Sequence, residues 1–96
     1  MLEVMTFSLV ADAQADPARF LAADARMQVA AYAQPGLVRR TTARGDDGRW
    51  AVVTLWASAA AADAALAALA DDPAAQAFEA FVAPGSRHRE RFTPLP

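Results

Sequence analysis

The 96-residue chain contains no cysteine, no lysine and no asparagine, and His88 is its only histidine. Without cysteine there can be no disulfide bond, no thiolate metal site and no cysteine nucleophile. The lack of lysine removes Schiff-base chemistry, and one histidine cannot supply a two-histidine metal site. We therefore expect neither a structural disulfide nor a bound metal ion.

Positive charge is also in short supply, since nine arginines face eleven acidic residues, for a net charge of -2 and an isoelectric point near 5.1. A protein that binds nucleic acid or an anionic membrane surface needs a basic field. The charge balance therefore argues against both partners. A chain of this length forms one domain, which we place over residues 1–96.

The longest apolar run, residues 50–70, carries one charge, Asp63. Its length alone would reach across a bilayer, which takes about 20 apolar residues. However, an aspartate near the centre of a span costs about 2.5–3.5 kcal/mol, and each of the three leucines returns only about 0.3–0.6 kcal/mol. The start of the run is β-branched and aromatic, whereas the part after Ser58 consists of helix formers. The run therefore predicts a strand over 50–57 and a helix over 59–70 with Ser58 as its N-cap, and no membrane span.

The N-terminal segment resembles a signal peptide only in part, because Glu3 stands where a basic region is expected and the apolar stretch is short. Its alternating pattern fits a strand better, with Met5, Phe7 and Leu9 on one face. We therefore expect a cytoplasmic protein.

The middle and end of the chain contain a weak duplication, because Asp-Pro-Ala occurs at 16–18 and 72–74, and Pro-Gly at 35–36 and 84–85. Aspartate before proline favours a helix start, and Pro-Gly favours a helix end. The predicted elements are a helix over 17–33, strands over 37–44 and 50–57 joined by a turn at 45–48, a helix broken at 71–73, and a strand over 86–93. This βαββαβ order predicts a ferredoxin-like α+β fold, a four-stranded antiparallel sheet with two helices on one face.

The strand over 50–57 is apolar on both faces, and the helices can cover only one of them. The small side chains of Ala51, Val53 and Leu55 suit close alanine-rich helices, which would leave Trp50 and Trp56 on the open face. An exposed apolar patch of this kind is rare in a monomer. The pattern predicts a homodimer in which the two sheets pack together.

Three features of the chain resemble the antibiotic biosynthesis monooxygenase-like superfamily of dimeric α/β-barrel proteins: Pro35-Gly36 before a strand, Trp56-Ala57-Ser58 entering an alanine-rich helix, and Phe78 with Phe81 before the last strand. The resemblance implies the ferredoxin-like dimer, with Trp56 facing a pocket between the sheet and the helices. Oxygenases of that superfamily work without a cofactor and also use a strand asparagine, which this chain lacks. Haem-degrading members carry a ligand histidine on the second helix. This chain has none there, so we expect no haem.

Several side chains are candidates for chemistry in such a pocket. The proposed catalytic residues are Trp56, His88 and Tyr32, and the proposed substrate-binding residues are Trp50, Trp56, Phe7 and Arg40. Each has a simpler interpretation: Trp56 as interface packing, Tyr32 as a packed ring whose hydroxyl reaches water, and His88 as a solvated strand residue instead of a general base. The arginines at 87, 89 and 91 fit either the entrance for an anionic ligand or the protection of a sheet edge.

Two functions remain open at this point. The chain is either a cofactor-independent monooxygenase that acts on or binds a small aromatic, polyketide-like molecule, or a non-catalytic dimeric module of the same fold. Such a module would bind a small apolar ligand, or would be stress-related and only assemble. Fold does not decide between them.

Overall fold

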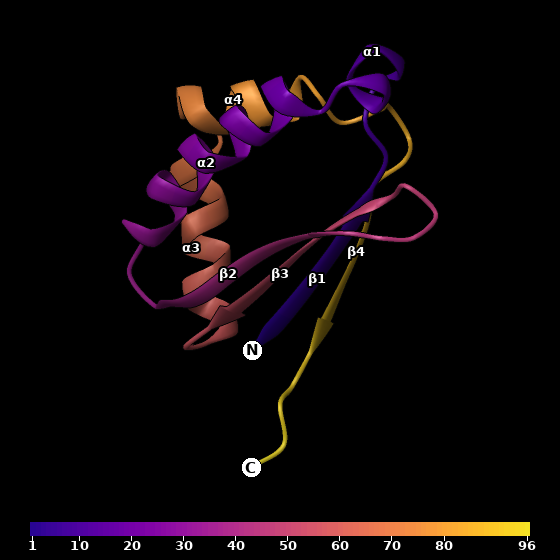
Figure 1. The fold of residues 1–96 in the computed structure, drawn as a ribbon. Helices are drawn as coiled ribbons and strands as arrows, with labels where there is room; N and C mark the ends of the chain where they lie inside the picture. The colour runs from indigo at the N-terminus through magenta and orange to yellow at the C-terminus, as the bar shows by residue number, and fades with distance from the viewer.

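The computed structural model describes the whole chain, Met1–Pro96. Its elements follow in the order β1 (Leu2–Phe7), α1 (Ala11–Ala15), α2 (Ala18–Tyr32), β2 (Leu37–Arg44), β3 (Trp50–Trp56), α3 (Ala59–Leu69), α4 (Pro73–Glu79) and β4 (His88–Phe92). The strands form one antiparallel sheet in the order β2-β3-β1-β4. Figure 1 shows α2, α3 and α4 on the same side of this sheet, as the ferredoxin-like prediction requires.

The predicted element order is confirmed, with two differences. The short helix α1 was not expected, and β4 is shorter than the strand predicted over 86–93. The break in the second helix is real and separates α3 from α4. No helix combines the length and the apolar character needed to cross a membrane.

The helix starts were predicted from capping residues, and two of them have the expected geometry. The Ser58 hydroxyl accepts a hydrogen bond from the Ala61 backbone N–H at 3.1 Å at the start of α3. The Asp72 carboxylate accepts one from Ala74 at 2.8 Å, with Pro73 in the first turn of α4. Each cap satisfies a backbone donor that would otherwise lack a partner. The chain can therefore end α3 and start α4 within a few residues, which lets α4 pack beside α2.

The predicted faces of β3 are wrong. Trp50, Val52, Thr54 and Trp56 are buried under the helices, and the alternate side chains point to the open face of the sheet. The physical reason lies in the alanine content of the helices. Small helix side chains leave space above the sheet, and large side chains from the sheet are needed to fill it.

The core at one end of the sheet is an aromatic cluster. Phe20 of α2 lies 5.0 Å from Trp50, 5.9 Å from Phe7 and 5.5 Å from Phe78 between ring centroids. Most of these pairs meet edge to face, the arrangement that the charge distribution of aromatic rings favours. A second, smaller cluster at the other end joins Trp56 to alanines of α3.

The start of β2 and the helix α3 approach each other closely at Gly36. This residue has φ +85°, and a Cβ atom placed on it would lie 2.6 Å from the Cβ of Ala61. Only glycine combines that backbone conformation with so little space. The Pro-Gly pair therefore ends α2 and also sets the distance between α3 and the sheet near Trp56.

Candidate functional site

A cavity of about 420 Å³ lies between the helix-covered face of the sheet and the helices α2, α3 and α4. This volume falls within the range of about 300–1,000 Å³ that is typical of small-molecule pockets. Eleven of the 18 lining residues are hydrophobic, so the cavity suits a largely apolar ligand. Alanines and leucines of α3 form one wall, and Met27 and Ala31 of α2 contribute to another.

The sheet side of the cavity carries a row of three polar side chains, Arg40, Thr54 and Trp56. Arg40 of β2 lies directly opposite Thr54 of β3 in the strand register, and Trp56 follows two residues later on the same face. Diagonal neighbours of this kind are about 7–8 Å apart, within the reach of long side chains. The row therefore places polar groups along the sheet side of the pocket, in addition to the charged residues at its border.

Trp56 contributes an unpaired donor to this row. The residue is 8% exposed, and its indole Nε1 is buried without a hydrogen-bond partner in the chain. The backbone of Trp56 is fixed by a hydrogen bond from its N–H to the Met1 carbonyl at 2.8 Å. A buried donor without an acceptor costs about 1–3 kcal/mol, and such a group is expected to have a function.

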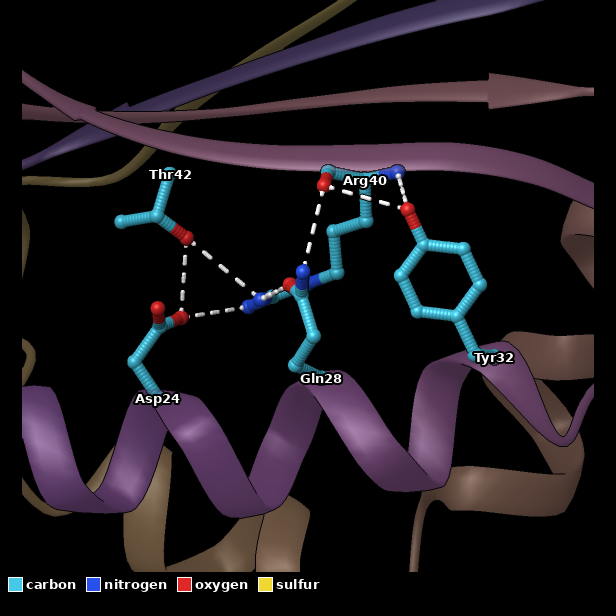
Figure 2. Close-up of polar contacts among 5 residues, drawn as sticks. All are labelled: Asp24, Gln28, Tyr32, Arg40 and Thr42. Atoms are coloured by element: carbon cyan, nitrogen blue, oxygen red, sulfur yellow. Dashed lines mark hydrogen bonds and ion pairs between the residues drawn. The ribbon is translucent and has the colours of Figure 1, made fainter.

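Arg40 is held in place by side chains from α2 and β2 (Figure 2). Its guanidinium donates to Asp24 and Gln28, both at 2.8 Å, and to Thr42 at 3.4 Å. Thr42 in turn donates to Asp24 at 2.9 Å. The guanidinium carbon also lies 5.7 Å from the centre of the Phe78 ring. A permanently charged group is therefore fixed in the cavity wall.

Tyr32 supports the backbone of Arg40 and does not line the cavity. Its hydroxyl accepts a hydrogen bond from the Arg40 N–H at 2.8 Å, and its ring is partly exposed. Figure 2 shows Asp24, Gln28 and Tyr32 projecting from the same face of α2 toward β2. The proposed catalytic role of Tyr32 stays a prediction, and this geometry gives the residue a positioning contact.

The cavity is bordered by paired charges where β1, β4 and α4 meet. Arg87 pairs with Glu79, and Arg89 Nε lies 3.8 Å from a carboxylate oxygen of Glu3. All four of these residues line the cavity. This places Arg87, just before β4, and Arg89 of β4 at the border of the cavity.

The third arginine, Arg91, joins the sheet to α3 outside the cavity. It lies 2.8 Å from Asp63 and 3.0 Å from Glu3. Its hydrogen bond to Asp63, followed by that to Glu3, raises the pKa of Arg91 above its usual value. Asp63, the charge that argued against a membrane span, therefore has an ionic partner at the protein surface.

The remaining candidates lie away from the cavity. Phe7 is fully buried in the aromatic cluster, and Trp50 lines a separate, more polar hollow beside Arg44. His88 is exposed on β4, with its Nε2 atom 2.6 Å from Glu90. Of the six predicted site residues, the structure therefore brings only Trp56 and Arg40 together at the cavity.

Sequence reasoning missed Thr54, Asp24 and Gln28. Thr54 is the only polar residue in the strand WAVVTLW, and that isolation was the available signal. Asp24, Gln28 and Tyr32 are spaced by four residues, which places them on one helix face. The sequence shows this spacing, but it does not show that Arg40 of β2 is the residue that this helix face contacts.

Comparison with known proteins shows a similarity in structure. No protein-family model matches the chain, and no curated protein matches it in sequence. Its structure is similar to that of SnoaB, a cofactor-independent oxygenase from Streptomyces nogalater, with a TM-score of 0.80 and 27% identity over 99% of this chain and 92% of that one.

Two further solved structures support the fold alone, because their sequence identities are low. An antibiotic biosynthesis monooxygenase matches at a TM-score of 0.75 and 14% identity, with full coverage of both chains. Rv0793 from Mycobacterium tuberculosis matches at 0.72 and 16% identity, over 99% of this chain and 94% of the other. The structural neighbours of this chain are antibiotic biosynthesis monooxygenase-like proteins, and the chain has the ferredoxin-like fold of that superfamily.

Proposed function

We propose that the protein is a cofactor-independent monooxygenase that oxidises a small, electron-rich aromatic molecule of the polyketide type in the cavity beside Trp56. One observation carries the proposal: Trp56, whose buried indole N–H has no partner, lines a largely apolar cavity of ligand size. The structural similarity to SnoaB, itself a cofactor-independent oxygenase, supports the same reaction class.

The reaction balances without an external reductant, as an anthrone-type substrate illustrates. Its methylene group loses a proton to water to give a stabilised anion, which donates electrons to O2. The carbon then gains one oxygen atom as a carbonyl, and the second oxygen atom leaves as water. All four electrons come from that carbon, so the protein has to supply orientation and stabilisation of the anion.

Oxygen consumption tests this proposal directly. The purified protein, freed of metal by a chelator, is mixed with a panel of anthrones and quinols while dissolved O2 and the product spectrum are recorded. We expect consumption of one O2 per molecule of an anthrone oxidised, above the rate without protein. If no member of the panel is turned over faster than in buffer, the oxygenase proposal fails.

A second function has one specific observation in its favour. The oxygenases of the superfamily that this chain resembles use a strand asparagine, and this chain contains no asparagine. Thr54 is the neutral polar side chain that lines the sheet side of the cavity here. A protein that binds the aromatic ligand without oxidising it would retain Arg40 and Trp56 as binding groups, and would show ligand binding without O2 consumption.

We also propose that the protein is a homodimer through the open face of the sheet, the face that the sequence suggested, but with other residues of β3 on it. The tryptophans are buried within the chain, but the open face of the sheet still carries apolar side chains. They come from β1, β3 and β4: Leu2, Val4, Ala51, Val53, Leu55 and Phe92. Among them, Phe92 is 48% exposed. A twofold contact between two such faces would cover each of them.

Val53→Asp should separate the dimer. Val53 lies in the middle of the open face, between Val4 and Thr41. Burial of one valine contributes about 1.5–3 kcal/mol to the free energy of association, and a twofold dimer buries one from each protomer. We therefore expect the dissociation constant of the variant to rise about 10²–10⁴-fold. Sedimentation velocity at micromolar concentration measures the effect. Val29→Asp on the exposed side of α2 is the control, because Val29 is 74% exposed. A monomeric parent protein would contradict the proposal.

A further inference from the structure

We propose that Arg40 is the residue that selects the ligand of the cavity, by binding an ionised oxygen on the free edge of its guanidinium group. The ligand would therefore be a phenol or enol bound as its conjugate base. This inference rests on the proposed function for the aromatic nature of the ligand, but its test does not depend on oxidation.

The hydrogen bonds of Arg40 leave part of the group unpaired. A guanidinium has five N–H donors, and three of them are used, two on Nη1 and one on Nη2. Asp24 and Thr42 are bonded to each other and accept from Nη2 and Nη1, so they occupy the edge between those two nitrogens. The Nε–H and the second Nη2–H have no acceptor in the chain. Together they form a free edge with two donors, the arrangement that gives bidentate, charge-assisted hydrogen bonds to anionic acceptors.

The surroundings of Arg40 favour a ligand that only accepts hydrogen bonds. Trp56, on the same side of the cavity, adds another unpaired N–H, and Thr54 lies opposite Arg40 in the strand register, two residues before Trp56. The carboxylates that line the cavity, Glu3 and Glu79, are already engaged by Arg89 and Arg87 respectively. Donors therefore exceed free acceptors beside Arg40, and an ionised oxygen fits this excess.

The same contacts make the site rigid. Asp24 and Gln28 hold the guanidinium, and Tyr32 holds the backbone of the same residue, so both ends of the Arg40 side chain are fixed by α2. A preorganised donor loses little freedom when the ligand binds. Asp24 offsets part of the positive charge, so we expect a moderate preference for the anion, about tenfold over the neutral form.

The experiment measures the ionisation of a bound probe. A hydroxyanthraquinone changes its visible spectrum when it ionises, and it is already a quinone, so it reports binding apart from oxygenation. In the parent protein we expect the apparent pKa of the bound probe to fall by about one unit, because one unit corresponds to tenfold tighter binding of the ionised form. The methyl ether of the probe, which cannot ionise, should bind with no dependence on pH.

The variants separate recognition from folding. Arg40→Met combined with Asp24→Asn removes both charges, so that neither is left buried and unpaired, and it should abolish the lowered pKa. Arg40→Lys, which keeps the charge without the planar edge, should retain part of it. Asp24→Asn alone should leave the pKa lowered, because the cation remains. Arg39→Met is the matched control, since Arg39 is exposed on the other face of the same strand.

The inference is overturned if the double variant lowers the pKa of the probe as much as the parent, or if the hydroxylated probe does not bind. Oxygen consumption by the same variants keeps the two proposals apart. A pKa lowered through Arg40 without O2 consumption would leave an anion-binding module and remove the oxygenase function. Turnover that is unchanged in the Arg40 variants would support the oxygenase function and remove the role of Arg40 in ligand selection.

Discussion

Turnover of an anthrone-type substrate is expected to fall about hundredfold when Trp56 is replaced by phenylalanine. The substitution keeps an aromatic ring in the cavity wall and removes the indole N–H, a buried donor that has no partner in the protein. Removal of one preorganised donor from an oxyanion site costs about 10²–10³ in kcat. Because the lost N–H is unsatisfied in the free protein, its removal should cost little stability.

Trp50→Phe is the matched control for this measurement. Trp50 lies on the same face of the same strand, but it packs on Phe20 in the aromatic cluster and does not line the cavity. We expect this variant to lose some stability and to keep its turnover. If Trp56→Phe retained the parent rate, or if both substitutions reduced turnover equally, the indole N–H would have no special part in the reaction.

The largest effect on stability is expected from Phe20→Ala, about 3–5 kcal/mol of the free energy of unfolding. Phe20 is completely buried and is in contact with Phe7, Trp50, Phe78 and Phe81. Its removal would leave a cavity at the only place where α2, α4 and the sheet share one aromatic cluster. The total free energy of unfolding of a domain is about 5–15 kcal/mol, so the variant should be close to unfolding at 37 °C.

Urea denaturation followed by circular dichroism measures this loss. We expect the midpoint to fall while the dependence of the free energy on urea stays the same. Leu21→Ala, on the neighbouring residue of the same helix, is the control because Leu21 is 46% exposed. That variant should stay within about 0.5 kcal/mol of the parent. A loss for Phe20→Ala as small as that for Leu21→Ala would show that the aromatic cluster is not the main source of stability.

The sequence predicted the elements well because their signals are local. Ser58 and Asp72 mark helix starts by their own hydrogen-bonding chemistry, and Gly36 ends α2 because it adopts a conformation that other residues avoid. The alternating pattern of β1 also gave the correct buried face. These features depend on a few neighbouring residues, so they can be read without knowledge of the tertiary structure.

The orientation of β3 was not predictable in the same way. Both faces of this strand are apolar, so its pattern allows either one to lie under the helices. Its orientation is set by packing across the gap, where Phe20 and Phe78 meet Trp50 and the alanines of α3 meet Trp56. The sequence could indicate Arg40 as a ligand-binding residue by its side-chain type. It could not indicate the ion pair with Asp24, because the two residues approach each other only after α2 folds onto β2.

The two hydrophobic clusters divide the space under the helices into a stabilising end and a ligand-binding end. Met5, Val52 and Phe78 stand at the boundary, since they belong to the aromatic cluster and also line the cavity. The far walls of the cavity are built largely from alanine, at residues such as Ala65, Ala70 and Ala75. Ala70 is exposed and Ala75 is half-buried, so both can be enlarged to reshape the pocket without disturbing Phe20. The chain is therefore a suitable starting point for evolving or engineering new ligand specificities at little cost to its stability.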